Sequence, residues 1–121
     1  RSYVDFALWG GVRSDDLRGG IDVEKQINDL ANSGVVGFKV YTISGMEEFH
    51  DLTYSEIGHV ASLIRNTGKP MGVHAEDKAI VVNMRTKLMA NGEQGWEAYC
   101  KARSVRAEAK AVSELVKIAE K

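Results

Sequence analysis

The sequence predicts an α/β fold in which about three βα units share one parallel sheet. Three short segments rich in β-branched and aromatic residues recur along the chain, at Tyr3–Trp9, Val35–Tyr41 and Met71–His74. Their starts lie about 32 and 36 residues apart, and a loop and a helical pattern follow each of them. Because helices separate the segments, the strands are expected to run parallel, with right-handed crossovers.

A first helix is predicted after a Gly-rich, charged stretch at 10–20. Asp22 is a suitable N-cap, and Gly34 is expected to end the helix in the left-handed conformation. The stretch 10–20 contains neither G-x-G-x-x-G nor Gly-Lys-Ser/Thr, so no nucleotide phosphate site is expected there. The apolar positions of the helix follow helical spacing and are Val23, Ile27, Leu30 and Ala31.

A second helix is predicted to begin at a capping box formed by Thr53 and Glu56. Gly68 and Pro70 are expected to end it. His59 falls outside its apolar stripe and is expected to face solvent. The stripe consists of Ile57, Val60, Ala61 and Ile64.

The chain after the third strand is predicted to be helical almost to its end, with breaks near Asn91-Gly92 and Gly95. The apolar stripe of the last helix consists of Ala107, Ala111, Leu115, Ile118 and Ala119. Helical spacing also indicates three packing residues, which are Met89, Trp96 and Tyr99.

Composition narrows the classes of function. The 16 Lys and Arg and the 17 Asp and Glu residues give a formal net charge of −1, without the basic field that nucleic acid or a membrane surface requires. Apolar runs are far shorter than the ~20 residues of a membrane span, and no leader pattern opens the chain. A single cysteine, Cys100, is typical of a reducing compartment. We expect a cytoplasmic protein without nucleic-acid or membrane partners, whose natural start precedes Arg1.

Strand parity brings polar groups to one face of the sheet. In the second strand, alternate residues from Gly37 through Lys39 to Tyr41 share a face, whereas Phe38 lies on the other. The third strand ends in the same way, with glycine followed two residues later by His74. Lys39 and His74 are therefore expected at equivalent depths on adjacent strands, near carboxyl ends where parallel α/β folds place their chemistry.

Lys39 has three interpretations. A neutral amine there could form a Schiff base with a carbonyl substrate. It could instead react with carbon dioxide and become a carbamate, an anionic ligand able to bridge two metal ions. Alternatively, the side chain extends to solvent or pairs with Asp5 on the neighbouring strand.

His74 is either a hydrogen-bonded residue at the rim of the sheet or a metal ligand. Glu76 and Asp77 follow it closely. They are candidates for orienting the imidazole, and equally for complementing the N-terminus of a helix.

The segment from Thr42 to Leu52 is longer than the usual ~2 to 6 residues of such a connection. Its His50, Asp51 and neighbouring Glu47 and Glu48 are interpreted as a charged surface loop. A role as a cover over a substrate remains open.

Three segments in this order resemble the cyclic amidohydrolases (allantoinases, dihydroorotases and hydantoinases) of the amidohydrolase superfamily. They are Val-Asp-Phe-Ala-Leu-Trp-Gly-Gly at 4–11, Gly-Val-Val-Gly-Phe-Lys at 34–39 and Val-His-Ala-Glu at 73–76. The resemblance covers nearly the whole chain. It implies that residues 1–121 are a single segment of a (β/α)₈ TIM barrel and supply its strands three to five.

The resemblance also implies a binuclear metal site. Lys39 matches the carboxylated lysine that bridges two divalent ions, usually zinc, and His74 matches a histidine ligand on the fifth strand. In such enzymes a metal-bridging hydroxide attacks the carbonyl of a small cyclic amide. The remaining ligands and the catalytic aspartate of the family have no counterpart in these 121 residues, so the segment alone is expected to be inactive and to hold no catalytic base.

Substrate contacts are implied next to the lysine. Hydantoinases carry a tyrosine five residues after it, whereas here Ser44 and Gly45 follow, which is more similar to an allantoinase or an archaeal-type dihydroorotase. Tyr41 is inward by parity, so its hydroxyl is a candidate to replace that tyrosine in part.

Two other functions remain open, a lyase with a Schiff-base Lys39 and a flavodoxin-like binding module without catalysis. A homo-oligomer is also expected, because three strands of a barrel leave two edges and an inner face uncovered. Phe6 and Leu8 are expected to lie beneath the helices of the chain itself.

Overall fold

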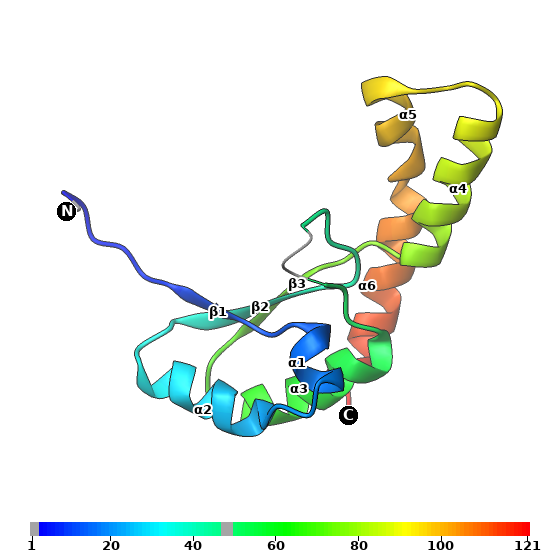
Figure 1. The fold of residues 1–121 in the computed structure, drawn as a ribbon. Helices are drawn as coiled ribbons and strands as arrows, with labels where there is room; N and C mark the ends of the chain where they lie inside the picture. Colours follow the sequence, from blue (N-terminus) through cyan, green and yellow to red (C-terminus); the bar gives the residue numbers. More distant parts are fainter. Residues whose placement is uncertain (1–2, 47–49) are drawn as a thin grey trace. The chain divides into compact units, whose positions relative to one another are not determined.

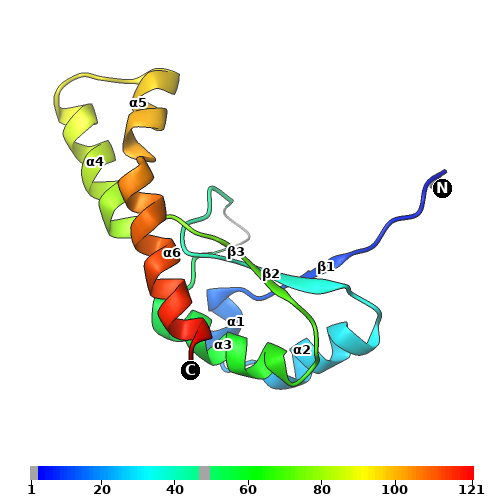
Figure 2. The ribbon, with the colours of Figure 1, turned by 180° about the vertical axis from the view of Figure 1, so that it is seen from behind.

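The computed structural model of the chain describes residues 3–46 and 50–121. It contains two compact units, residues 1–74 and residues 75–121, and each is described by itself. The first unit carries the sheet and three helices, and the second consists of helices (Figures 1 and 2).

The sheet has three parallel strands in the order β1-β2-β3, as predicted. The strands are β1 (Trp9–Gly11), β2 (Gly37–Tyr41) and β3 (Met71–His74). In register, Trp9 pairs with Gly37, Lys39 pairs with Gly72, and Tyr41 pairs with His74. The α/β class with parallel strands is therefore confirmed.

The first strand is shorter than predicted. It begins at Trp9 rather than at Tyr3, because β2 begins only at Gly37 and the earlier residues have no strand to pair with. One hydrogen bond, from the Val36 amide to the Leu8 carbonyl, precedes the ladder. The expectation that Phe6 and Leu8 lie beneath the helices is wrong, since they are 72% and 66% exposed.

Helix α2 (Val23–Asn32) follows the predicted boundaries. The Asp22 carboxylate accepts a hydrogen bond from the Lys25 amide at 2.9 Å, and Gly34 ends the helix with a φ of +94°. Val23 and Ile27 are buried. Both α2 and α3 lie on one side of the sheet in Figures 1 and 2.

Helix α3 (Tyr54–Arg65) begins at the predicted capping box. The Glu56 amide donates to the Thr53 hydroxyl at 3.2 Å, and the Thr53 amide donates to the Glu56 carboxylate at 2.7 Å. Arg18 donates two hydrogen bonds to the Glu56 carboxylate, at 2.9 and 3.0 Å. Arg18 ends a short helix, α1 (Ser14–Arg18), in the stretch that sequence analysis treats as a loop.

The core of the first unit lies between the sheet and its helices. Phe38 and Val40 of β2 are fully buried, which confirms the predicted orientation of that face. The other fully buried apolar side chains are Val12, Ile27, Ile57 and Val60, with Ile64 2% exposed.

Residues 75–121 contain α4 (Lys78–Ala90), α5 (Gly95–Ala102) and α6 (Val105–Ala119). The break between α4 and α5 falls where Asn91, Gly92 and Gly95 predict it. A further break at Arg103-Ser104 was not predicted. Asp77 caps α4 through the Ile80 amide, and its own amide donates to the Ala107 carbonyl.

Three residues expected to pack in this helical unit are exposed instead: Met89 is 58%, Trp96 77% and Tyr99 49% exposed. The Trp96 and Tyr99 rings stack on each other, with centroids 5.2 Å apart. The Arg103 guanidinium lies 4.7 Å from the Tyr99 ring centre. Helical spacing places these side chains together on one face, but it does not show whether another element covers that face.

Among the residues that the structure describes, no helix is long and apolar enough to cross a membrane. Cys100 is exposed and its thiol is free.

Candidate functional site

The predicted polar residues share the face of the sheet opposite Phe38. Lys39 and Tyr41 come from β2, and His74 ends β3. The expectation of equivalent depth is wrong: Lys39 pairs with Gly72, whereas His74 pairs with Tyr41, two residues further along β2. At ~3.3 Å per residue this offset is about 6.6 Å along the strand. Parity alone predicts the face but not the register, which explains the error.

The amine of Lys39 extends across this offset toward the carboxyl end of the sheet. Its Nζ lies 4.7 Å from the centre of the Tyr41 ring, and Tyr41 is the residue in register with His74. Parity predicts that Lys39 faces inward, and the structure agrees.

The Lys39 side chain is half-buried, and this burial lowers the pKa of its amine below the usual range for lysine. Within residues 3–46 and 50–121, no ion pair joins Lys39 to a carboxylate, so the alternative in which Lys39 pairs with Asp5 is not observed. A lowered pKa raises the fraction of neutral, nucleophilic amine.

His74 is exposed, and its ring centre lies 5.8 Å from that of Tyr41, with a tilt of 34°. The His74 carbonyl accepts hydrogen bonds from the Thr42 amide at 3.0 Å and from its hydroxyl at 2.9 Å. These bonds hold the last residue of β3 against β2. The Tyr41 ring therefore lies beside both the amine of Lys39 and the imidazole of His74.

An aromatic side chain, that of Trp9, packs on the two glycines of this face. Parity places Trp9 on the inner face but does not predict this contact. A Cβ on Gly37 would lie 2.8 Å from Cζ3 of Trp9, and a Cβ on Gly72 would lie 3.3 Å from the same atom. The indole therefore occupies the space that the two glycines leave empty. The sequence does carry a sign of this packing: a glycine lies two residues before Lys39 on β2, and another lies two residues before His74 on β3.

Ser44 and Gly45 lie in the loop that follows β2. The Ser44 amide donates to the Asp51 carboxylate, and the Ser44 hydroxyl accepts from the Met46 amide at 3.0 Å. The base of the loop is closed by a 2.9 Å hydrogen bond from the Leu52 amide to the Tyr41 carbonyl.

His50 of this loop pairs with Asp15 of α1 at 2.6 Å. The interpretation of the loop as charged surface holds for His50, which is exposed. Of its other proposed members, Asp51 is half-buried and accepts the hydrogen bond from the Ser44 amide, and Glu47 and Glu48 lie outside the described residues.

Glu76 belongs to the second unit, where it is half-buried and forms an ion pair with Arg103. Its proposed role in orienting the His74 imidazole stays a prediction. The alternative interpretation of the acidic pair is confirmed for Asp77, which caps α4.

The donor chemistry of this face fits part of a metal site. An imidazole, and an amine that becomes a two-oxygen carbamate when carboxylated, are both suitable donors to zinc. In the part of the chain that the structure describes, no group of three or more His, Cys, Asp or Glu side chains is arranged to hold a metal ion. The described residues thus offer two candidate donors but no complete ligand set.

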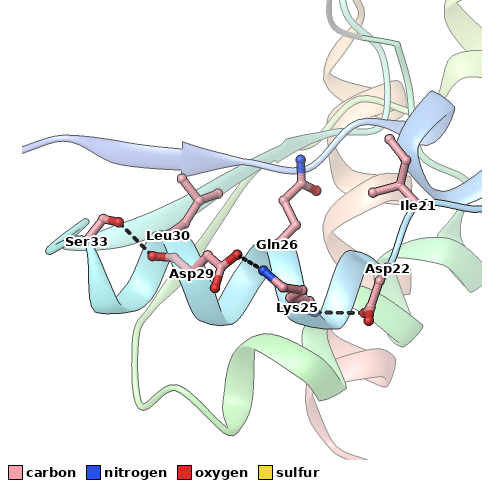
Figure 3. Close-up of a pocket in the computed structure, with 7 residues that line it drawn as sticks. All are labelled: Ile21, Asp22, Lys25, Gln26, Asp29, Leu30 and Ser33. Atoms are coloured by element: carbon pink, nitrogen blue, oxygen red, sulfur yellow. Dashed lines mark hydrogen bonds and ion pairs between the residues drawn. The ribbon is translucent and has the colours of Figure 1, made fainter.

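An open pocket of about 390 Å³ lies along α2, and none of the candidate residues lines it (Figure 3). Its charged groups are engaged with one another, as in the 2.5 Å ion pair between Lys25 and Asp29. Its lining residues are Ile21, Asp22, Lys25, Gln26, Asp29, Leu30 and Ser33. The pocket therefore adds nothing to the candidate site.

Comparison with known proteins shows relatives of one kind, although no family model matches the sequence. Allantoinases from Desulfitobacterium hafniense and Solibacter usitatus are 31% and 35% identical to this chain over 121 and 115 residues. These matches cover 98% and 92% of the chain. They span only 25% and 23% of the length of the two relatives.

Solved structures of hydantoinases are similar in fold to this chain. L-Hydantoinase (dihydropyrimidinase) from Arthrobacter aurescens matches with a TM-score of 0.82 and 25% identity, over 97% of this chain and 25% of its own. D-Hydantoinase from a Thermus species has a TM-score of 0.80 at 21% identity, which supports the fold alone. Hydantoinases contain TIM-barrel domains, which is the fold that the family resemblance implies for this chain. Sequence and fold together identify the chain as a segment that belongs to the cyclic amidohydrolase family, and it spans about a quarter of the length of the relatives it matches.

Proposed function

We propose that this chain contributes Lys39 and His74 to the binuclear metal site of a cyclic amide hydrolase, and that its parent protein opens the ring of a small cyclic amide or ureide. The observation that carries the proposal is the Lys39 amine. It is half-buried, has a lowered pKa and extends toward the residue paired with His74. The allantoinase relatives favour a ureide over other cyclic amides as substrate.

Carboxylation of Lys39 gives this amine a chemical role. The neutral amine attacks carbon dioxide, an N–C bond forms, and one proton leaves to solvent. The product is a carbamate with two oxygens and one negative charge, which would serve as a ligand to two divalent ions. His74 contributes an imidazole nitrogen to one of them. When bound, two such ions, zinc by the donor types, supply Lewis-acid polarisation of an amide carbonyl and acidify water.

The substrate ring is held by groups next to Lys39. The Ser44 hydroxyl and the Tyr41 hydroxyl are the hydrogen-bonding groups proposed to contact a ring carbonyl. Gly45 has no side chain, and among the described residues a Cβ there would meet no atom within 4 Å. The fragment by itself is proposed to be inactive, since two donors do not complete a catalytic zinc site. The parent is proposed to be a cytoplasmic homo-oligomer.

Ring-opening assays on the parent protein test this function. Zinc-loaded enzyme is offered allantoin, hydantoin and dihydroorotate, and the variants Lys39→Ala and His74→Ala are compared with it. Loss of several kcal/mol of Lewis-acid stabilisation corresponds to about 10²-fold to 10⁴-fold lower kcat/KM. Two control variants, Lys69→Ala and His59→Ala, alter a lysine and a histidine elsewhere in the first unit and are expected to leave the rate unchanged. Full activity in Lys39→Ala would contradict the proposal.

The lowered pKa of Lys39 also favours a second candidate, a lyase that forms a Schiff base. The two functions differ in one experiment. Borohydride in the presence of a keto substrate would reduce a Schiff base and attach the substrate covalently to Lys39, whereas a carbamate gives no such adduct. We expect no adduct.

A further inference from the structure

On the inner face of the sheet, an indole occupies the side of Lys39 that lies toward the amino end of the strands. Toward the amino end, the indole of Trp9 lies over Gly37 and Gly72, at 2.8 and 3.3 Å from where their Cβ atoms would be. The Cδ of Lys39 lies 3.9 Å from the same Cβ position on Gly72. The aliphatic part of Lys39 and the indole therefore both approach the same glycine.

Toward the carboxyl end, the Lys39 amine reaches the Tyr41 ring. Gly72, the register partner of Lys39, has no side chain, whereas His74 stands two residues further along β3. The lysine must therefore lean along the strand to bring its Nζ toward His74. The contact of 4.7 Å between Nζ and the Tyr41 ring centre shows that it leans in this direction.

We propose that Trp9 is a positioning residue for Lys39: its indole fills the inner face over Gly37 and Gly72 and thereby directs the Lys39 amine toward Tyr41 and His74. This inference rests on the proposed function. It explains how the Lys39 amine can reach the same metal site as His74, although the two residues are offset by two positions along the strands. The arrangement itself concerns only Trp9, Lys39 and Tyr41, so it can be tested without any enzyme activity.

The attraction between Lys39 and Tyr41 does not account for this orientation by itself. A single cation–π contact at a partly exposed site is weak compared with the rotamer freedom of a lysine. A bulky ring over the glycines acts differently, because it excludes the rotamers that lean toward the amino end. Trp9 is 52% exposed, so the indole contributes more to this exclusion than to the core of the unit.

Gly37 and Gly72 provide the space that the Trp9 indole occupies. An alanine at Gly72 would place its Cβ 3.3 Å from Cζ3 of Trp9, closer than most side-chain contacts, and 3.9 Å from Cδ of Lys39. The indole would have to shift. This requirement gives a physical reason for the sequence pattern in which a glycine comes two residues before Lys39 and again two residues before His74.

NMR spectroscopy of the full chain with ¹³C-labelled lysine tests the proposal, without metal and without added bicarbonate. The ε-methylene protons of Lys39 are assigned by their absence in Lys39→Met. They are expected to show an upfield ring-current shift, which Tyr41→Leu abolishes and thereby assigns to the Tyr41 ring. Trp9→Ala is expected to lose most of that shift, whereas Trp9→Phe, which keeps a ring over the glycines, retains most of it.

Trp96→Ala is the matched control, because it removes the other tryptophan of the chain, in the second unit. It is expected to leave the Lys39 shift unchanged. An unchanged shift in folded Trp9→Ala, or an equal loss in Trp96→Ala, would overturn the proposal. If Trp9→Ala does not fold, Gly72→Ala decides: displacement of the indole predicts a reduced shift, and an unaltered shift would overturn it.

Failure of this inference and failure of the proposed function are distinguishable. If the parent hydrolyses no cyclic amide but the Lys39 shift depends on Trp9, the positioning stands and the function fails. If hydrolysis depends on Lys39 but the shift does not depend on Trp9, the reverse holds.

Discussion

The amine of Lys39 lies 4.7 Å from the centre of the Tyr41 ring, although the register partner of Lys39 on β3 is Gly72 and that of Tyr41 is His74. A long side chain thus compensates for an offset that the backbone ladder imposes. Tyr41 is the residue that the two candidate metal donors have in common, because its ring also lies 5.8 Å from the His74 ring.

Replacement of Tyr41 is expected to impair the parent enzyme through this contact. Tyr41→Leu removes the ring that lies beside the Lys39 side chain. Loss of the coupling between these two neighbouring side chains, about 0.5–3 kcal/mol, corresponds to roughly 2-fold to 150-fold lower kcat/KM. Tyr41→Phe keeps the ring and loses only the hydroxyl proposed to bind substrate, so its defect should fall mainly on KM. Steady-state kinetics of both variants measure the difference. Equal kinetic constants for the two variants would show that the ring has no role.

Gly10 is expected to tolerate no side chain. A Cβ there would lie 2.9 Å from the ring of Phe38, which is fully buried, and 3.3 Å from Leu30. Gly10→Ala should therefore lower the free energy of unfolding by about 1–3 kcal/mol, as overpacked cores do. Gly45→Ala is the control, since no atom lies within 4 Å of its Cβ position. Urea denaturation compares the two, and an equal effect of both substitutions would contradict the packing described here.

Glu56 is expected to make the first unit sensitive to acid. Two hydrogen bonds from Arg18, with those of the capping box, lower the pKa of Glu56 to about 2 from an ordinary value of 4.5. A carboxylate whose pKa is lower in the folded state stabilises the fold above its unfolded pKa. That contribution should be lost as the pH falls from about 4.5 to about 2.

Denaturation as a function of pH checks this expectation. At neutral pH, Glu56→Ala should cost about 1 kcal/mol, as the loss of a helix cap does. Its stability should also fall less steeply than that of the unmodified chain below pH 4.5. Glu24→Ala changes an exposed glutamate in the first turn of α2 and should keep the original pH dependence. A Glu56→Ala curve parallel to the unmodified one would contradict the assigned pKa.

Local signals in the sequence predict much of this fold because they act over a few residues. Alternation with a period of two identifies the face of Lys39 and that of Phe38. The capping box at Thr53 and the left-handed Gly34 depend only on nearby backbone groups, and both are observed. The resemblance to cyclic amidohydrolases is confirmed by the relatives. The assignment of Lys39 and His74 as metal ligands stays a prediction.

Features that depend on contacts between segments far apart in the sequence could not be predicted from local patterns. The register that pairs Lys39 with Gly72 is a property of two strands that are far apart in the sequence. The late start of β1 depends on where β2 begins, and the exposure of Trp96 depends on which elements cover α5. The packing of Trp9 on Gly72 likewise requires all three strands.

Carboxylation of Lys39 gives a carbonyl carbon that ¹³C NMR of the zinc-loaded parent protein in ¹³C-bicarbonate detects by its own resonance. We predict one carbamate carbon resonance per chain that requires zinc and disappears in Lys39→Ala but not in Lys69→Ala. Two zinc ions should be bound per chain in the unmodified protein, and fewer in Lys39→Ala. Fully active, zinc-loaded protein without a carbamate resonance, or a resonance that survives Lys39→Ala, would contradict the account.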